Sequence, residues 1–148
     1  MPVDTPFFDS SYVVRLYLED QGFETVRELA GRGQVVACAW HGQAEVVAAL
    51  HRAFRERRMD VGIFRAMLEQ LGVDTEEGLF RWLPLSDKVQ QRLAVVFAAA
   101  PTTLFLRAAD ALHLACAAEH GFREVYSNDR RFLEAAPLFG LKGRNVIG

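Results

Sequence analysis

Two aspartates stand at positions where an α/β protein can carry out chemistry. Asp9 closes the short predicted strand PFFD, and Asp129 follows the predicted strand REVYS, each directly before a predicted helix. Parallel sheets gather their functional groups at the carboxyl ends of the strands. Helix capping, which aspartate does well, is the alternative role for either residue taken alone. Together the two positions predict a pair of carboxylates at one edge of a sheet.

Two further acids are predicted to face the same edge. Glu45 lies in the early turns of the helix that follows strand 34–38, and Asp110 lies near the start of the helix RAADALHLACA. Favourable interaction with a helix N-terminus, worth about 0.3–1 kcal/mol, is the alternative explanation. It is weak for Asp110, because that helix is apolar nearly all round and a buried carboxylate must be paired, protonated or metal-bound. A divalent cation with oxygen ligands would supply the countercharge.

The elements that must position these acids alternate along the chain. The predicted strands cover residues 6–9, 34–38, 78–85, 123–127 and 144–147. The predicted helices cover residues 11–19, 23–30, 40–58, 60–71, 86–99, 106–120 and 129–136, with a turn at 31–33. This alternation predicts an α/β fold, a three-layer α/β/α arrangement with a mainly parallel sheet of about four to five strands.

Composition bounds the class of protein. The chain has 148 residues, 51% of them hydrophobic and 24% charged, which predicts one globular domain over residues 1–148. A net charge of −2 gives no global electrostatic drive toward nucleic acid, so such binding needs a local basic patch. Cys38 and Cys116, both in apolar company, predict reduced thiols and a cytoplasmic location. No signal peptide is apparent and no uncharged run is long enough for a membrane span.

Four segments resemble the acidic motifs of the PIN-domain ribonucleases, and above all the VapC toxins of type II toxin–antitoxin pairs. They are FFDSSYVVRLYLED, AWHGQAEVVAALHRAF, LRAADALHLACAAEHG and VYSNDRRFLEAAPLFGL. The likeness follows nearly the whole chain in order. ADALHLA, followed by a strand and then SND before RRFLEAA, is its most specific part, and the pattern around Glu45 is its least specific.

The resemblance implies a site and an activity. Asp9, Glu45, Asp110 and Asp129 would be the acidic catalytic residues that bind Mg²⁺ or Mn²⁺ and cut RNA. It also implies a cognate antitoxin that blocks the site, and we expect a homodimer. The candidate substrate-binding residues beside the acids are Ser10, Ser11, Ser127, Asn128, Arg130 and Arg131. One departure stands out, because family members commonly carry a serine shortly after the second strand, where this chain has ACAWHG.

Several alternatives remain open on the residues alone. A PIN-like module without catalysis, serving as an RNA- or protein-binding part, is the main one. A magnesium phosphatase or phosphotransferase with Asp9 as nucleophile is the other. His113 follows Asp110 by three residues, so it could orient that carboxylate or simply pack in the core. The apolar segments 61–71 and 93–100 fit a dimer or antitoxin surface or the core, and arginines 52, 55, 57 and 58 fit phosphate contacts or a solvated helix face.

Overall fold

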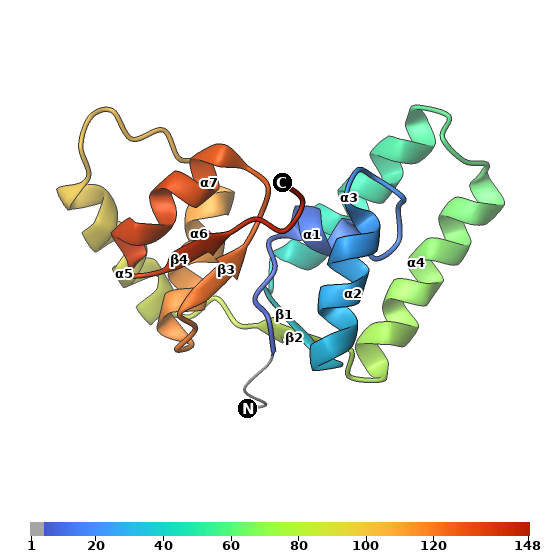
Figure 1. Ribbon diagram of the computed structural model, residues 1–148, viewed down its shortest axis with the longest axis horizontal. Helices are drawn as coiled ribbons and strands as arrows, with labels where there is room; N and C mark the ends of the chain where they lie inside the picture. The colour runs from blue at the N-terminus through green and yellow to red at the C-terminus, as the bar shows by residue number, and fades with distance from the viewer. Residues whose placement is uncertain (1–4) are drawn as a thin grey trace.

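Parallel strands run through the middle of the molecule. The computed structural model describes residues 5–148. Strand β1 (Val36–Ala39) pairs in parallel with β2 (Phe80–Leu83), and β3 (Glu124–Tyr126) pairs in parallel with β4 (Lys142–Arg144). Residues 7–8 join the two pairs, because Phe7 bridges to Ala37 and Phe8 bridges to Tyr126, both in parallel. The resulting order is β2–β1–(7–8)–β3–β4, and the blue N-terminal segment passes between the two pairs in Figure 1.

Helices surround these strands. They are α1 (Ser10–Val14), α2 (Phe23–Gly33), α3 (Gly42–Arg55), α4 (Val61–Glu76), α5 (Asp87–Ala99), α6 (Ala108–Glu119) and α7 (Arg130–Ala135), followed by the 3-10 helix η1 (Ala136–Phe139). Figure 1 shows α5, α6 and α7 on one side of the molecule and α1 to α4 on the other.

Two hydrophobic cores lie on opposite faces of the strands. Successive strand residues point to opposite faces, and here Phe7 joins the core beneath α5, α6 and α7 while Phe8 joins the core beneath α1 to α4. Strand β1 divides in the same way, with Ala37 in the first core and Cys38 in the second. Apolar residues therefore fill both faces, and the predicted three-layer α/β fold with parallel strands is confirmed.

Side-chain caps fix where several helices begin. The Asp60 carboxylate accepts a hydrogen bond of 2.8 Å from the backbone N–H of Ile63 at the start of α4. Ser86 caps α5 in the same way, by accepting from the N–H of Val89. Satisfying these free N–H groups stabilises a helix by about 0.5–2 kcal/mol.

Several predicted boundaries were wrong. Helix α4 continues to Glu76 rather than ending at residue 71, and α3 ends at Arg55 rather than at residue 58. The segment 31–33, predicted as a turn, belongs to α2, which ends at Gln34 with a positive φ of 61°. Helix α1 stops at Val14 rather than continuing to residue 19. The last strand is Lys142–Arg144 rather than 144–147, because Gly143 packs closely on Leu133 while Val146 and Ile147 pack on the second core.

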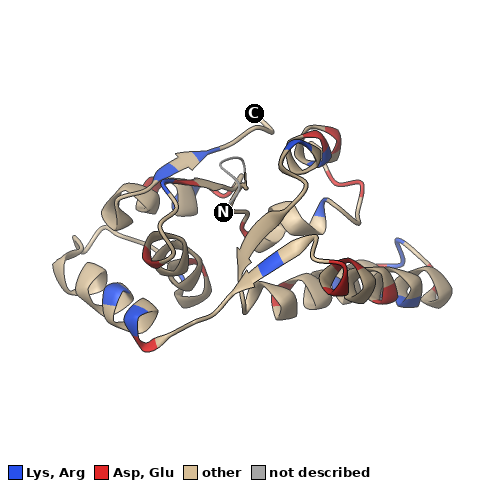
Figure 2. Cartoon of the chain, turned by 90° about the horizontal axis from the view of Figure 1, so that it is seen from below, with Lys and Arg blue, Asp and Glu red and all other residues tan. Residues whose placement is uncertain are grey.

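Charge is spread over the molecule rather than gathered on one side. Figure 2 shows basic and acidic positions interspersed along the helices, in agreement with the net charge of −2. Within residues 5–148, no helix combines the length and apolar character needed to cross a bilayer.

Candidate metal centre

Asp9 lies at the carboxyl end of the central segment, and three hydrogen bonds fix its carboxylate. Its Oδ1 accepts from the Ser11 hydroxyl at 2.8 Å and from the Tyr12 backbone N–H at 3.0 Å. Its Oδ2 accepts from the Ser127 hydroxyl at 2.5 Å. Burial raises the pKa of Asp9, and these three hydrogen bonds oppose that rise. Each carboxylate oxygen can accept about two bonds, so Oδ2 keeps capacity for one more ligand.

Ser127 connects Asp9 to Asp129. The Ser127 hydroxyl donates to Asp9 and accepts from the Asp129 backbone N–H at 2.9 Å. Asp129 caps α7, because its Oδ1 accepts from the Phe132 N–H at 3.0 Å. In the part of the chain that the structure describes, Asp129 Oδ2 accepts no hydrogen bond. Capping uses one oxygen and leaves the other for a ligand, so the two roles are compatible in one residue.

Asp110 is the carboxylate without a partner. It lies half-buried in the first turn of α6 and makes no hydrogen bond or ion pair with any residue of 5–148. Burial raises the pKa of Asp110, and the nearby carboxylates of Asp129, Asp9 and Glu45 raise it further. Asp110 therefore lies within electrostatic range of the other three predicted acids, and no described side chain forms a hydrogen bond or ion pair with its carboxylate. Among the described residues, the group whose possible ligand atoms all lie within 4.8 Å of one another is His41, Glu45 and His113.

Two histidines lie beside Glu45, at the start of α3, and one of them, His113, forms a hydrogen bond with it. Glu45 Oε1 accepts from His113 Nε2 at 2.5 Å and lies 3.6 Å from His41 Nε2. His113 is fully buried, and its ring lies 4.1 Å from that of His41 between centroids. Burial alone would raise the pKa of Glu45, but the hydrogen bond and charge of His113 outweigh it and lower that pKa. Of the two roles predicted for His113, packing in the core is the one observed, and its hydrogen bond holds Glu45 rather than Asp110.

Comparisons with known proteins identify the family of the chain. The family model for the PIN domain matches residues 7–137. The chain belongs to the PIN domain family. PIN domains are generally nucleases, and they typically use divalent metals. A comparison with curated proteins finds no match.

A solved structure supports the same fold. The PIN domain is similar to a chain in the crystal structure of VapBC2 from Rickettsia felis bound to a DNA fragment from their promoter. The likeness has a TM-score of 0.66 and 11% sequence identity, and it covers 95% of this chain and 98% of that chain. At this identity the match describes the fold.

The segment ACAWHG, where this PIN domain departs from the family pattern, brings α3 very close to β1. A Cβ at Gly42 would collide with the Cys38 sulfur, so only glycine fits at that position without a shift. His41, directly before it, donates from Nε2 to the Ala109 carbonyl at 2.9 Å, because a carbonyl can only accept. An imidazole therefore lies beside Glu45 in a segment that carries no serine. The His41–Glu45 spacing of four residues on one helix is the signal that could have revealed it.

The remaining predicted residues lie around the acids. The Ser11 hydroxyl lies 3.3 Å from Asn128 Oδ1, and a hydrogen bond from Ser10 helps to lower the pKa of Glu45. Arg130 pairs with Glu134 at 2.8 Å, whereas the Arg131 guanidinium lies 3.8 Å above the Phe105 ring. An open pocket of about 430 Å³ is lined by Asp129, Arg130, Arg131 and Glu134.

Two residue groups outside the acids have the simpler of their predicted roles. Cys38 and Cys116 are buried free cysteines, and burial raises the pKa of both thiols. In the basic run 52–58, Arg52 pairs with Glu56 at 3.3 Å and Arg58 pairs with Asp20 at 2.6 Å. These exposed pairs favour a solvated helix face.

Proposed function

We propose that this PIN domain is a metal-dependent endoribonuclease that cleaves RNA phosphodiester bonds, and that it is the toxin of a toxin–antitoxin pair. The observation that carries the proposal is the half-buried Asp110 carboxylate, which has no partner among residues 5–148 and lies within electrostatic range of the other three acids. Such a group is costly in a folded protein unless a ligand compensates it. A cation bound between the acids would do so.

The available donors fit Mg²⁺ or Mn²⁺. Asp110, together with the second oxygens of Asp9 and Asp129, offers carboxylate ligands, which these cations prefer. Glu45 completes the set through Oε2, since Oε1 is held by His113. When bound, the cation would lower the pKa of a coordinated water and offset charge on the phosphate.

The chain's own residues hold these ligands in place before substrate arrives. Ser11, Ser127 and the Tyr12 N–H fix Asp9, and His113 fixes Glu45. Ligands held in this way are preorganised, which spares the reorganisation that a mobile side chain would require. Three hydrogen bonds on Asp9 also make it a poor nucleophile, which argues against the phosphotransferase alternative.

The proposal of an antitoxin partner rests on the structurally similar VapBC2 chain and on exposed apolar residues of this chain. The structurally similar chain comes from a VapBC2 complex, which supports an antitoxin as partner of this chain. Val61, Ile63 and Val73 on α4 and Val95 and Phe97 on α5 are exposed, and they could bury against an antitoxin or a second copy of the chain.

Cleavage of single-stranded RNA tests the proposed activity. We expect cleavage with Mg²⁺ or Mn²⁺, none with EDTA, and loss of cleavage in Asp110→Asn. The matched control is Asp87→Asn, because Asp87 also lies in the first turn of a helix, α5, but outside the cluster of acids. Metal-independent cleavage, or equal activity in Asp110→Asn, would contradict the proposal. Tight RNA binding without cleavage under all metals would favour the binding-module alternative.

A further inference from the structure

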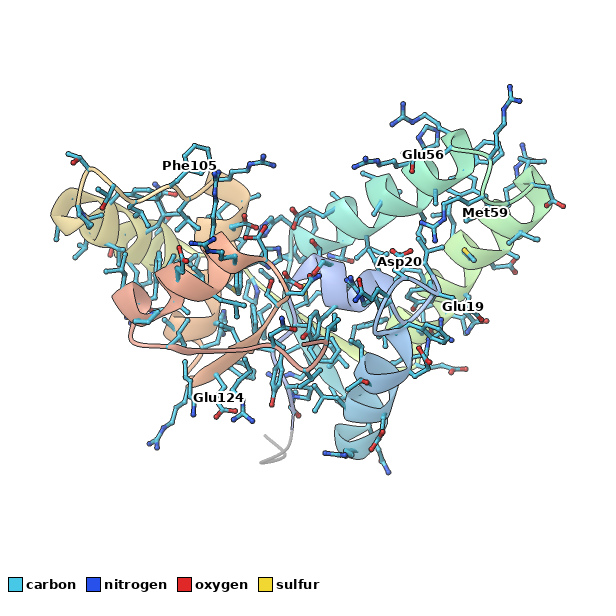
Figure 3. All side chains as sticks on the ribbon, turned by 45° about the horizontal axis from the view of Figure 1, so that its top comes forward. Glu19, Asp20, Glu56, Met59, Phe105 and Glu124 are labelled. Carbon is cyan, nitrogen blue, oxygen red and sulfur yellow. The ribbon has the colours of Figure 1, made fainter. Side chains whose placement is uncertain are left out.

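Phe105 is an exposed aromatic residue whose two neighbours in the chain are held against the core. It lies in the extended segment before α6 and is 57% exposed. Its neighbours Leu104 and Leu106 pack against the core beneath α5, α6 and α7. Because side chains alternate along an extended segment, anchoring both leucines turns the Phe105 ring outward. Figure 3 shows Phe105 on the outer side of this loop.

Arg131 covers part of the ring. Its guanidinium carbon lies 3.8 Å from the centroid of Phe105. Arg130 is paired with Glu134, but in residues 5–148 no carboxylate pairs with Arg131. A stacked guanidinium keeps its N–H groups free at the edge of the plane, where they can donate to phosphate. The two side chains therefore combine a planar apolar face with unused donors.

The position of this pair relates it to the candidate metal centre. Phe105 stands five residues before Asp110, and Arg131 stands two residues after Asp129. Both acids lie near helix starts at the same edge of the strands, and the Asp129 charge raises the pKa of Asp110. Arg131 also lines the pocket that contains Asp129. The pair thus lies at the border of the acids.

We infer that Phe105 and Arg131 form a binding site for one unpaired nucleobase and its phosphate, next to the bond that the acids would cleave. The inference rests on the proposed ribonuclease function and adds that the substrate is single-stranded at this position. A base stacks on the Phe105–Arg131 pair, and the guanidinium edge donates to the adjoining phosphate. Base–aromatic stacking tolerates any base, so the pair contributes affinity and strand preference rather than sequence preference.

The protein partner is the competing explanation for an exposed phenylalanine. Three features favour RNA. The Arg131 face is stacked rather than paired with an acid, the adjacent pocket is lined by polar side chains, and Arg131 lines that pocket together with Asp129. Phe97 on α5 is also an exposed phenylalanine, but among the described residues no arginine stacks on its ring, so it better resembles a protein contact.

Fluorescence of an RNA strand containing 2-aminopurine tests the inference directly. This adenine analogue loses fluorescence when it stacks on an aromatic ring. A short oligoadenylate carrying it at each position in turn is titrated with the protein, with Ca²⁺ in place of Mg²⁺ and strand integrity checked on a gel. We expect quenching at one position and weaker binding of the same strand in duplex form.

Substitutions then assign the quenching to Phe105. Phe105→Leu keeps an apolar side chain but loses the ring, and we expect its affinity to fall about 5- to 100-fold, with loss of quenching. Phe105→Trp should retain both. The matched control is Phe97→Leu, because Phe97 is an exposed phenylalanine on α5. Arg131→Lys keeps the charge but loses the planar face. Its affinity for the RNA strand should therefore lie between those of Phe105→Leu and the unsubstituted protein.

The outcomes separate this inference from the proposed function. Metal-dependent RNA cleavage together with unchanged affinity and quenching in Phe105→Leu would overturn the base site, favour a protein contact there and leave the ribonuclease proposal standing. Absence of RNA binding and cleavage in the unsubstituted protein would overturn both. Equal losses in Phe97→Leu and Phe105→Leu would also refute a site at Phe105.

Discussion

The clearest thermodynamic prediction concerns Asp110→Asn, which removes one negative charge at nearly constant volume. Burial and neighbouring carboxylates raise the pKa of Asp110 in the folded protein. An acid whose folded pKa is raised contributes most to stability below its unfolded pKa, and that contribution is lost as the pH rises through the folded pKa. At neutral pH, without metal, the ionised Asp110 therefore destabilises the fold. Asparagine should raise the metal-free melting temperature, or at least not lower it.

Metal should raise the melting temperature of the unsubstituted protein more than that of Asp110→Asn. A cation that binds the folded state stabilises it by RT ln(1 + [L]/Kd), about 2.7 kcal/mol at one hundred times Kd. For 148 residues the entropy of unfolding is about 0.3 kcal/mol/K. The expected metal-induced rise in the melting temperature is therefore about 9 °C for the unsubstituted protein. It should shrink to a few degrees in Asp110→Asn, because the substitution removes the only carboxylate among the four acids with both oxygens free in the described residues.

Melting curves with EDTA and with several millimolar Mg²⁺ or Mn²⁺, for both proteins and for Asp87→Asn, test this reasoning. The control should keep the full metal shift, since Asp87 lies outside the acidic cluster. Suppose instead that Asp110→Asn melts well below the unsubstituted protein in EDTA and keeps the full metal shift. Asp110 would then be a structural group of α6, and the argument from its missing partner would be wrong.

Three other substitutions test individual contacts. Ser127→Ala removes the hydroxyl that donates to Asp9 and accepts from Asp129, so the free energy of unfolding should fall by about 1.5–3 kcal/mol in urea titrations; an unchanged midpoint would show that the bond contributes nothing. His113→Asn frees Glu45 and should weaken metal binding by about 10- to 100-fold in calorimetry while circular dichroism stays unchanged; equal affinity would mean that Glu45 needs no anchor. Gly42→Ala pushes a methyl group into the Cys38 sulfur and should cost about 1–3 kcal/mol of stability. The double variant Gly42→Ala with Cys38→Ala should recover part of that loss, and strictly additive losses would exclude the collision as the cause.

The sequence predicted the sheet and the acids for the same physical reason. Apolar runs bounded by turn residues identify buried strands, and a carboxylate directly after such a run, as at Asp9 and Asp129, falls at the carboxyl end of a parallel sheet. Both residues also have the capping geometry that was the alternative, since each accepts a backbone N–H of the helix that follows. Local sequence therefore predicted where Asp9 and Asp129 lie and that each caps a helix.

Contacts between residues far apart in the sequence could not be predicted in this way, because they depend on how the helices and strands pack together. His113 is 68 positions from Glu45, and only the packing of α6 against β1 and α3 decides that it reaches that carboxylate rather than Asp110. The turn predicted at 31–33 failed because glycine only weakens a helix, by about 1 kcal/mol relative to alanine, and burial of Val26 and Ala30 holds α2 together. Val146 and Ile147 look like strand residues, but they pack on the second core after β4 has ended.

The two-residue central segment has a consequence for how the protein is made. Asp9 is synthesised well before its hydrogen-bond donor Ser127, which lies 118 positions later, and Phe8 bridges to the equally distant Tyr126. Contacts so distant in sequence form late and slowly. No nascent chain that ends before Ser127 contains the assembled cluster of acids, so the centre can form only after the 118 positions from Asp9 to Ser127 have been synthesised.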